Sequence, residues 1–281
     1  MIGARGVELK NSEQIRRMRR AGLVVAQTHA AVAAAAAPGV TTADLDAVAR
    51  DILASRGAGS SFLGYGGGLG LPPFPGVTCI SVNDEIVHGI PGERVLVEGD
   101  LVSVDFGAIV EGWHGDGAVT FPVGTWTSER LRLSDVTRDA LWAGIAAIRQ
   151  GGRVGDISCA VEESVDGADG HEFGIVEEYT GHGIGSQMHQ PPDVPNLGRP
   201  GRGPRIVPGL CLAVEPMVTW GSAETATLDD EWTVVTHDGS DAAHWEHTIA
   251  VTGTGLWVLT AFDGGEEMLD RLGVRFGPLA A

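Results

Sequence analysis

Four acidic residues and one histidine stand in stretches of the chain that are otherwise apolar or glycine-rich. They are Asp105 in LVSVDFG, Asp116 in GWHGD, Glu215 in CLAVEPMV, Glu246 in HWEHTIAV and His182 in GHGIG. A single such acid is usually a structural ion-pair residue. Four together need compensation, because a buried carboxylate without a partner costs several kcal/mol or stays protonated. Few basic residues lie near these segments, so the sequence favours bound cations.

The composition of this residue set indicates which cations these would be. Carboxylates with one imidazole form a hard, oxygen-rich ligand set that suits a pair of divalent ions such as Mn, Fe, Co or Zn. Two such ions about 3.5–4 Å apart can hold a bridging hydroxide and polarise a carbonyl group. The residue types therefore predict metal-assisted hydrolysis.

The elements that must hold these residues alternate between pairs of helices and groups of strands. Capping residues and apolar spacing predict helices at about 12–37, 41–56, 134–150 and 156–165. Strands are expected at 77–82, 85–90, 101–107 and 117–124, and again in five segments between 175 and 260. Residues 59–76 are too rich in Gly and Pro for regular structure. The tail 263–281 is left unassigned.

The two halves of the chain resemble one another at their helix pairs. AAPGVTTADLDAVARDIL in the first half and RQGGRVGDISCAVEESV in the second share a Gly turn, an Asp-Leu/Ile step and an Ala-Val step. An internal duplication would give two similar α+β halves whose sheets meet at a cleft.

Charge and composition exclude several classes of protein. The chain has 281 residues, with 19 Lys and Arg against 37 Asp and Glu, a net charge of −18. An acidic surface repels phosphate backbones, so we expect no nucleic-acid partner. Lys10 is the only lysine and lies outside any recognisable site motif. A phosphate-binding Walker loop and a lysine Schiff base are therefore not expected.

The N-terminal basic and apolar run, from Arg16 to Ala37, superficially resembles a signal peptide. It carries polar residues and its own helix start and stop, so we interpret it as a folded helix. No other stretch approaches the ~18 apolar residues of a membrane span. The three cysteines, Cys79, Cys159 and Cys211, are odd in number and widely spaced, which is typical of a reducing compartment. We expect a cytoplasmic monomer without membrane association.

Five motifs, in order, give the chain a family resemblance. They are CISVNDEIVHGIP, VDFG with GWHGD, GHGIG with MHQPP, AVEPM and HWEHT. The chain resembles type I methionine aminopeptidase over about residues 10–262. The resemblance implies the α+β, duplicated pita-bread (creatinase/aminopeptidase) fold, with two pseudo-symmetric halves of helix pairs and antiparallel sheet. Residues 1–281 would form one catalytic domain, with halves at about 10–125 and 128–262.

The resemblance also implies the activity and the roles of individual residues. The activity would be removal of the initiator methionine from methionyl peptides and nascent chains with a small second residue. The metal ligands would be Asp105, Asp116, His182, Glu215 and Glu246, the set already assembled from the residues. A hydroxide bridging two metal ions would attack the first carbonyl, with Glu215 as general base, His189 stabilising the tetrahedral intermediate and His88 orienting the scissile amide. Tyr65, Phe74, Cys79, Met188 and Trp232 would surround the methionine side chain.

The sequence departs from the family pattern at three places. The loop between Tyr65 and Cys79 is longer and richer in glycine. Gly107 stands where a threonine commonly supports the metal-binding aspartate, so that hydrogen bond is expected to be absent. Met188 replaces an aromatic residue beside His189, and its flexible thioether is expected to relax side-chain selectivity.

Two other functions remain open from the sequence. An Xaa-Pro aminopeptidase or dipeptidase would share the fold and all five ligands. Such enzymes usually carry an extra domain before the catalytic one, whereas the catalytic pattern here begins near residue 10. A non-enzymatic binding module on the same fold would have lost ligands, and all five are present.

Overall fold

The computed structural model describes residues 6–68 and 70–280. The first helix pair is α1 (Ser12–Ala35) and α2 (Thr42–Arg56). Both begin at capping boxes, in which Asn11 and Gln14 bond each other's backbone, as do Thr41 and Asp44. Gly57 ends α2 in the left-handed conformation that glycine adopts most readily. The signal-like run is thus part of a folded helix, as predicted.

The first half of the chain builds a sheet around a long hairpin. β4 (Leu101–Val110) pairs with β5 (Trp113–Pro122), and β4 also pairs with β2 (Cys79–Val82) and the short β1 (Gly59–Ser60). The hairpin turns at Glu111-Gly112, where both residues have positive φ. All pairings are antiparallel, as expected from the strand spacing.

The second half repeats a helix pair followed by strands. Its helices are α3 (Ser128–Ala147) and α4 (Val154–Asp166), and its five-stranded sheet contains β15 (Leu256–Val258), β14 (His247–Val251), β9 (Cys211–Val214), β7 (Gly181–Gly183) and β8 (Gln190–Val194). One small sheet joins β6 (Gly174–Ile175), β10 (Met217–Thr219) and β13 (Ala242–His244), and another joins β3 (Glu85–Val87), β11 (Thr225–Thr227) and β12 (Val234–Thr236).

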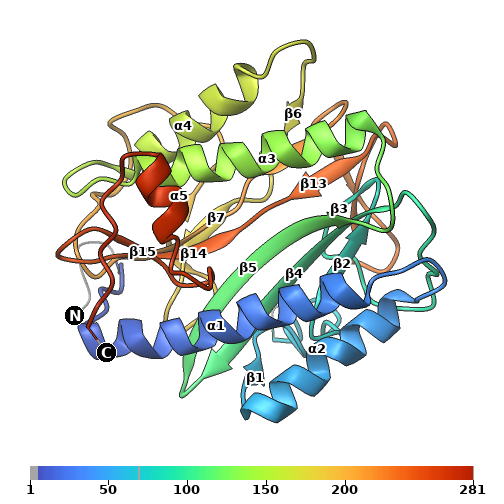
Figure 1. Cartoon of the computed structure of the whole chain (residues 1–281), viewed down its shortest axis with the longest axis horizontal. Coiled ribbons are helices and arrows are strands. Elements are labelled where there is room, and N and C mark those ends of the chain that lie inside the picture. The colour runs from blue at the N-terminus through green and yellow to red at the C-terminus, as the bar shows by residue number, and fades with distance from the viewer. Residues whose placement is uncertain (1–5, 69, 281) are drawn as a thin grey trace.

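The strands lie between the two helix pairs. In Figure 1, α1 and α2 run along one side of the molecule, α3 and α4 along the opposite side, and β4, β5, β13 and β14 cross between them. One apolar core joins α1 and α2 to β4, and a second joins α3 and α4 to β9 and β14. This arrangement gives the α+β architecture of paired halves that the sequence predicts.

The structure differs from the sequence prediction in the lengths of several elements. The third helix begins at Ser128 rather than at 134, because the Thr127 hydroxyl accepts a bond from the Arg130 N–H and caps it six residues earlier. Most second-half strands are only three to five residues long. The tail contains a helix, α5 (Glu266–Arg271). Within the described residues, no helix is both long and apolar enough to cross a membrane.

Candidate metal centre

The hairpin of β4 and β5 brings the first two acids together. Asp105 pairs with Ala118 and Asp116 with Gly107, so the two acids are diagonal neighbours across the ladder. Diagonal neighbours project from the same face of a sheet. Two carboxylates that approach on one buried face repel each other unless a cation or a proton lies between them.

The second half supplies the other three predicted ligands from separate strands. His182 is the middle residue of β7, Glu215 follows β9, and Glu246 precedes β14. Glu246 reaches the first half through a two-way backbone bridge to Ala118, with N···O distances of 2.9 and 3.3 Å. His182 Nε2 lies 3.5 Å from Glu215 Oε1. The structure therefore brings all five predicted residues to the junction of the two halves.

Burial dominates the electrostatics of this group. It raises the pKa values of Asp105, Glu215 and Glu246 well above their usual range, and the neighbouring carboxylates raise them further. Burial also raises the pKa of Asp116, to about 7. Burial lowers the pKa of His182 to about 3, which keeps its imidazole neutral. A divalent cation bound here would displace the carboxyl protons, and it would find the imidazole already in the neutral form that binds metal.

The donor atoms fit a metal site. One ligand atom each from Asp116, His182 and Glu246 lie within 4.8 Å of one another. Asp105 Oδ1 and Glu246 Oε1 are buried and have no hydrogen-bond partner among the described residues. Buried polar atoms in folded proteins nearly always have a partner. Carboxylate oxygens left free beside a neutral imidazole are what a hard or borderline divalent ion requires.

Two further histidines lie beside this centre. His189 Nδ1 is 2.7 Å from the hydroxyl oxygen of Tyr65, and its ring centroid is 4.3 Å from that of His182. His88 directly follows β3 and has a φ of +60°, a conformation that non-glycine residues adopt uncommonly and that is often found at functional sites. Both histidines line the cavity that also contains the metal-centre carboxylates.

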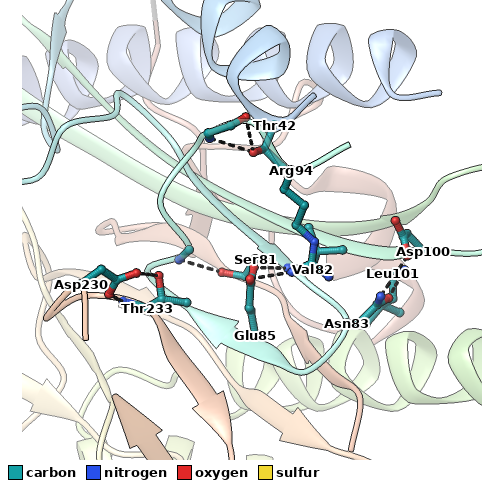
Figure 2. Close-up of polar contacts among 12 residues, drawn as sticks. Thr42, Ser81, Val82, Asn83, Glu85, Arg94, Asp100, Leu101, Asp230 and Thr233 are labelled. Atoms are coloured by element: carbon teal, nitrogen blue, oxygen red, sulfur yellow. Dashed lines mark hydrogen bonds and ion pairs between the residues drawn. The ribbon is translucent and has the colours of Figure 1, made fainter. Parts of the chain in front are cut away.

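Polar contacts around β2 and β3 hold His88 in this position. Figure 2 shows the Glu85 carboxylate joined both to the Val82 N–H and to Arg94. Asn83, also at positive φ, bonds Asp100 and Leu101 and ties the turn between the two strands to the start of β4. The hairpin of β2 and β3, which ends at His88, is therefore fixed by side-chain hydrogen bonds on both strands and at its turn.

An apolar pocket adjoins the metal centre. The five residues predicted to surround a methionine side chain pack together with Phe62 and Ile90; they are Tyr65, Phe74, Cys79, Met188 and Trp232. All five also line the cavity of about 170 Å³ that contains the metal-centre carboxylates. Cys79 pairs with Asp105 across β2 and β4, which sets the apolar pocket directly beside the acids.

Several residues that line the cavity were not predicted. Phe62 belongs to the pocket cluster, and His244 is 2% exposed with its Nε2 3.8 Å from Glu215 Oε2. His244 stands two residues before Glu246, so strand alternation within HWEHT was the signal that could have found it. Phe62 carries no such signal, because a phenylalanine before a glycine-rich loop looks like ordinary core. Tyr179, Thr180 and Met217 also line the cavity.

Comparison with known proteins agrees with this geometry. The family model described as metallopeptidase family M24 matches residues 16–253. Methionine aminopeptidase 1 of Mycobacterium tuberculosis is 49% identical over 262 residues, which cover 92% of this chain and 96% of that protein. The chain belongs to the methionine aminopeptidases of metallopeptidase family M24. The resemblance seen in the sequence is thereby confirmed.

Among solved structures, this chain is more similar to methionine aminopeptidases than to prolidases. The methionine aminopeptidase of Rickettsia prowazekii superimposes with a TM-score of 0.86 at 35% identity, covering 91% of this chain and all of that one. Prolidase from Pyrococcus furiosus superimposes with a TM-score of 0.69 at 18% identity, and 65% of that chain is covered. The second likeness shows the shared pita-bread fold alone, so the methionine aminopeptidase assignment is favoured over the Xaa-Pro alternative.

Gly107, a departure from the usual methionine aminopeptidase pattern, has a packing reason. A Cβ atom at this position would lie 2.7 Å from Ser61 Cβ and 2.9 Å from Phe62 Cε1. The Ser61 hydroxyl lies 2.9 Å from His114 Nδ1, on the strand that carries Asp116. The space that a larger side chain would take is therefore filled by the segment that precedes the pocket.

Proposed function

We propose that this protein removes the N-terminal methionine from peptides and nascent chains by metal-assisted hydrolysis of the first peptide bond. The observation that carries the proposal is the direct junction between a buried carboxylate–histidine centre and an apolar pocket of aromatic, Met and Cys side chains. Such a pocket suits a flexible apolar side chain. The family comparisons support the same activity.

We propose that two divalent ions, of Co, Mn, Fe or Zn, are held by Asp105, Asp116, His182, Glu215 and Glu246. Bound there, the ions would supply an activated water and polarise the first carbonyl group. The free carboxylate oxygens and the neutral imidazole support this ligand set. Because the five residues come from both halves, we also propose that residues 1–281 act as one catalytic domain.

Glu215 is the proposed general base. Its carboxylate lies between two neutral imidazoles, 3.5 Å from His182 and 3.8 Å from His244. A carboxylate whose pKa is raised by burial can take a proton from the attacking water and give it to the leaving amine.

His189 is proposed to stabilise the developing oxyanion. If the Tyr65 hydroxyl donates to His189 Nδ1, the imidazole carries its proton on Nε2 and can donate it toward the substrate. His88, fixed by its braced hairpin, would orient the scissile amide. The neighbouring rings of Trp232 and Tyr179, at centroid distances of 6.0 and 5.3 Å, restrict its movement.

We propose a cytoplasmic, monomeric enzyme. The three cysteines are all free thiols in the structure, which agrees with a reducing compartment. The net charge of −18 opposes self-association and binding to nucleic acid.

The decisive experiment compares substrates and measures bound metal. The purified protein should release methionine from Met-Ala-Ser and little from peptides with a bulky second residue. Asp105→Ala should lose both bound divalent metal and activity, whereas the exposed Asp169→Ala should keep both. Equal or faster cleavage of Xaa-Pro peptides without methionine would contradict the substrate assignment. Absence of metal together with inactivity after metal addition would contradict the enzyme assignment.

A further inference from the structure

A second hollow lies against the mouth of the metal-centre cavity. It has a volume of about 510 Å³ and is lined by Leu71, His88, Tyr179, Thr227, Leu228, Glu231 and Trp232. We call it the Leu71–Leu228 groove. We propose that it binds the side chain of the third residue of the substrate and selects an apolar residue there. The proposal rests on the proposed function and assigns a further substrate subsite to the same enzyme.

The groove continues the path that a bound peptide would take. His88, Tyr179 and Trp232 line both the cavity and the groove. With the first side chain in the pocket and the scissile bond at His88, the peptide leaves the cavity past His88. Side chains alternate along an extended peptide, so residues 1 and 3 lie on one side, about 7 Å apart. The first would contact the pocket side of Trp232, and the third would enter the groove beyond it.

The walls of the groove expose apolar side chains. Leu71 is 39% exposed and Leu228 is 45% exposed, and they come from segments far apart in the sequence. Among the described residues, only eight large apolar side chains are this exposed, and two of them line this one hollow. Apolar side chains gathered in a concave surface next to a catalytic cavity are typical of a ligand site.

The wall that carries Leu71 is held in place by the rest of the glycine-rich loop. The Trp232 indole N–H donates to the Pro72 carbonyl, with a distance of 2.9 Å. Gly66 lies so close to the Trp232 ring that a Cβ there would be 2.5 Å from Cζ2. The Phe74 N–H bonds the Tyr65 carbonyl at 2.8 Å and closes the loop. These contacts hold the described residues 71–74 in place as one wall of the groove.

The opposite wall is a tight turn between β11 and β12. Asp230 accepts hydrogen bonds from the Trp232 and Thr233 N–H groups and from the Thr233 hydroxyl, and Figure 2 shows its contact with Thr233. The Leu228 N–H bonds the Thr233 carbonyl, with a distance of 2.8 Å. Because both walls are already fixed, binding of a side chain in the groove does not carry the entropic cost of ordering them.

The β11–β12 side of the groove is acidic. Glu231, which lines it, and the nearby Asp229 are exposed, and neither forms an ion pair within the described part of the chain. An acidic third residue would place a like charge against Glu231, which disfavours binding. The groove therefore selects an apolar third residue and rejects aspartate.

The test uses three peptides that differ only at the third residue: Met-Ala-Leu-Gly, Met-Ala-Gly-Gly and Met-Ala-Asp-Gly. With metal-loaded enzyme, kcat/KM for the leucine peptide should exceed that for the glycine peptide about fivefold, as expected for partial burial of a leucine side chain. The aspartate peptide should be the poorest, and Glu231→Gln should improve it selectively. The double substitution Leu71→Ser, Leu228→Ser should bring the leucine-to-glycine ratio close to one.

Leu131→Ser is the matched control, because Leu131 is 51% exposed on α3 and does not line the groove. It should keep the wild-type ratio. Equal cleavage of the leucine and glycine peptides by the wild type, or an unchanged ratio in the double variant, would overturn the groove while leaving the methionine activity intact. Failure to release methionine from any of the three peptides would overturn the proposed function and the groove with it.

Discussion

Gly107 offers a sharp test of how packing supports the metal centre. Replacing it with alanine adds a Cβ 2.7 Å from Ser61 Cβ and 2.9 Å from Phe62 Cε1, where an ordinary contact is 3.4–4 Å. The neighbouring segment cannot withdraw freely, because the Ser61 N–H bonds the Gly107 carbonyl at 3.0 Å. Relief of the clash therefore requires a shift of β4, which carries Asp105, or of Phe62, which lines the cavity.

The cost of this clash can be bounded. Adding a methyl group to a well-packed core typically costs 1–3 kcal/mol, and we expect about 2 kcal/mol for Gly107→Ala. Ser61→Gly removes the opposing Cβ but also loses the hydroxyl contact with His114, worth about 1 kcal/mol. The double variant should therefore be more stable than the sum of the single changes predicts, with a coupling of at least about 1 kcal/mol.

The assay is urea unfolding of the wild type, both single variants and the double variant at one fixed metal concentration, because bound metal adds to stability. Gly253→Ala is the control, since a Cβ there meets nothing within 4 Å, and it should stay within about 0.5 kcal/mol of wild type. A Gly107→Ala variant as stable as Gly253→Ala, or a coupling near zero, would refute the packing explanation for this glycine.

Three further predictions concern pH, metal and orientation. Burial, and to a smaller extent the neighbouring His247, lower the pKa of His29 to about 3, below its unfolded value of about 6.5, so stability should fall as pH drops through this window. By pH 4.5 the share due to His29 should reach about 3 kcal/mol. Urea titrations should therefore show a loss of stability that is smaller by about this amount in His29→Gln than in the wild type or in the exposed-site control His237→Gln. Chelation should lower the melting temperature reversibly, because the metal-centre carboxylates lose their cations; an unchanged value would argue against a resident metal. Tyr65→Phe should lower kcat about tenfold through loss of the hydrogen bond to His189, and an unaltered kcat would remove the orienting role.

The local features of this chain could be predicted from its sequence because they depend on neighbouring residues. The capping boxes at Asn11 and Thr41 and the β4–β5 hairpin are determined by short-range hydrogen bonds and side-chain alternation. The early start of α3 was missed, because the polar first turn after Thr127 shows no apolar periodicity.

The site was predictable to the extent that its residue types are unusual in their surroundings. Asp105 and Glu246 stand out because a carboxylate in an apolar strand needs an explanation. His244 and Phe62 did not stand out, because a histidine or phenylalanine is common in a core. The Leu71–Leu228 groove was not predictable either. It depends on how a glycine-rich loop meets the β11–β12 turn, which is a contact between segments far apart in the sequence.

The bridge between Ala118 and Glu246 has a consequence for how the enzyme matures. Asp105 and Asp116 meet within one hairpin, whereas Glu246 arrives from the last strands of the fold. Contacts between distant parts of a chain form slowly, because a long loop must close before they are gained. In a partly synthesised copy of this chain, only Asp105 and Asp116 would be in place, and they would bind metal weakly. Tight metal binding would therefore require that the last β-strands have packed onto the rest of the fold.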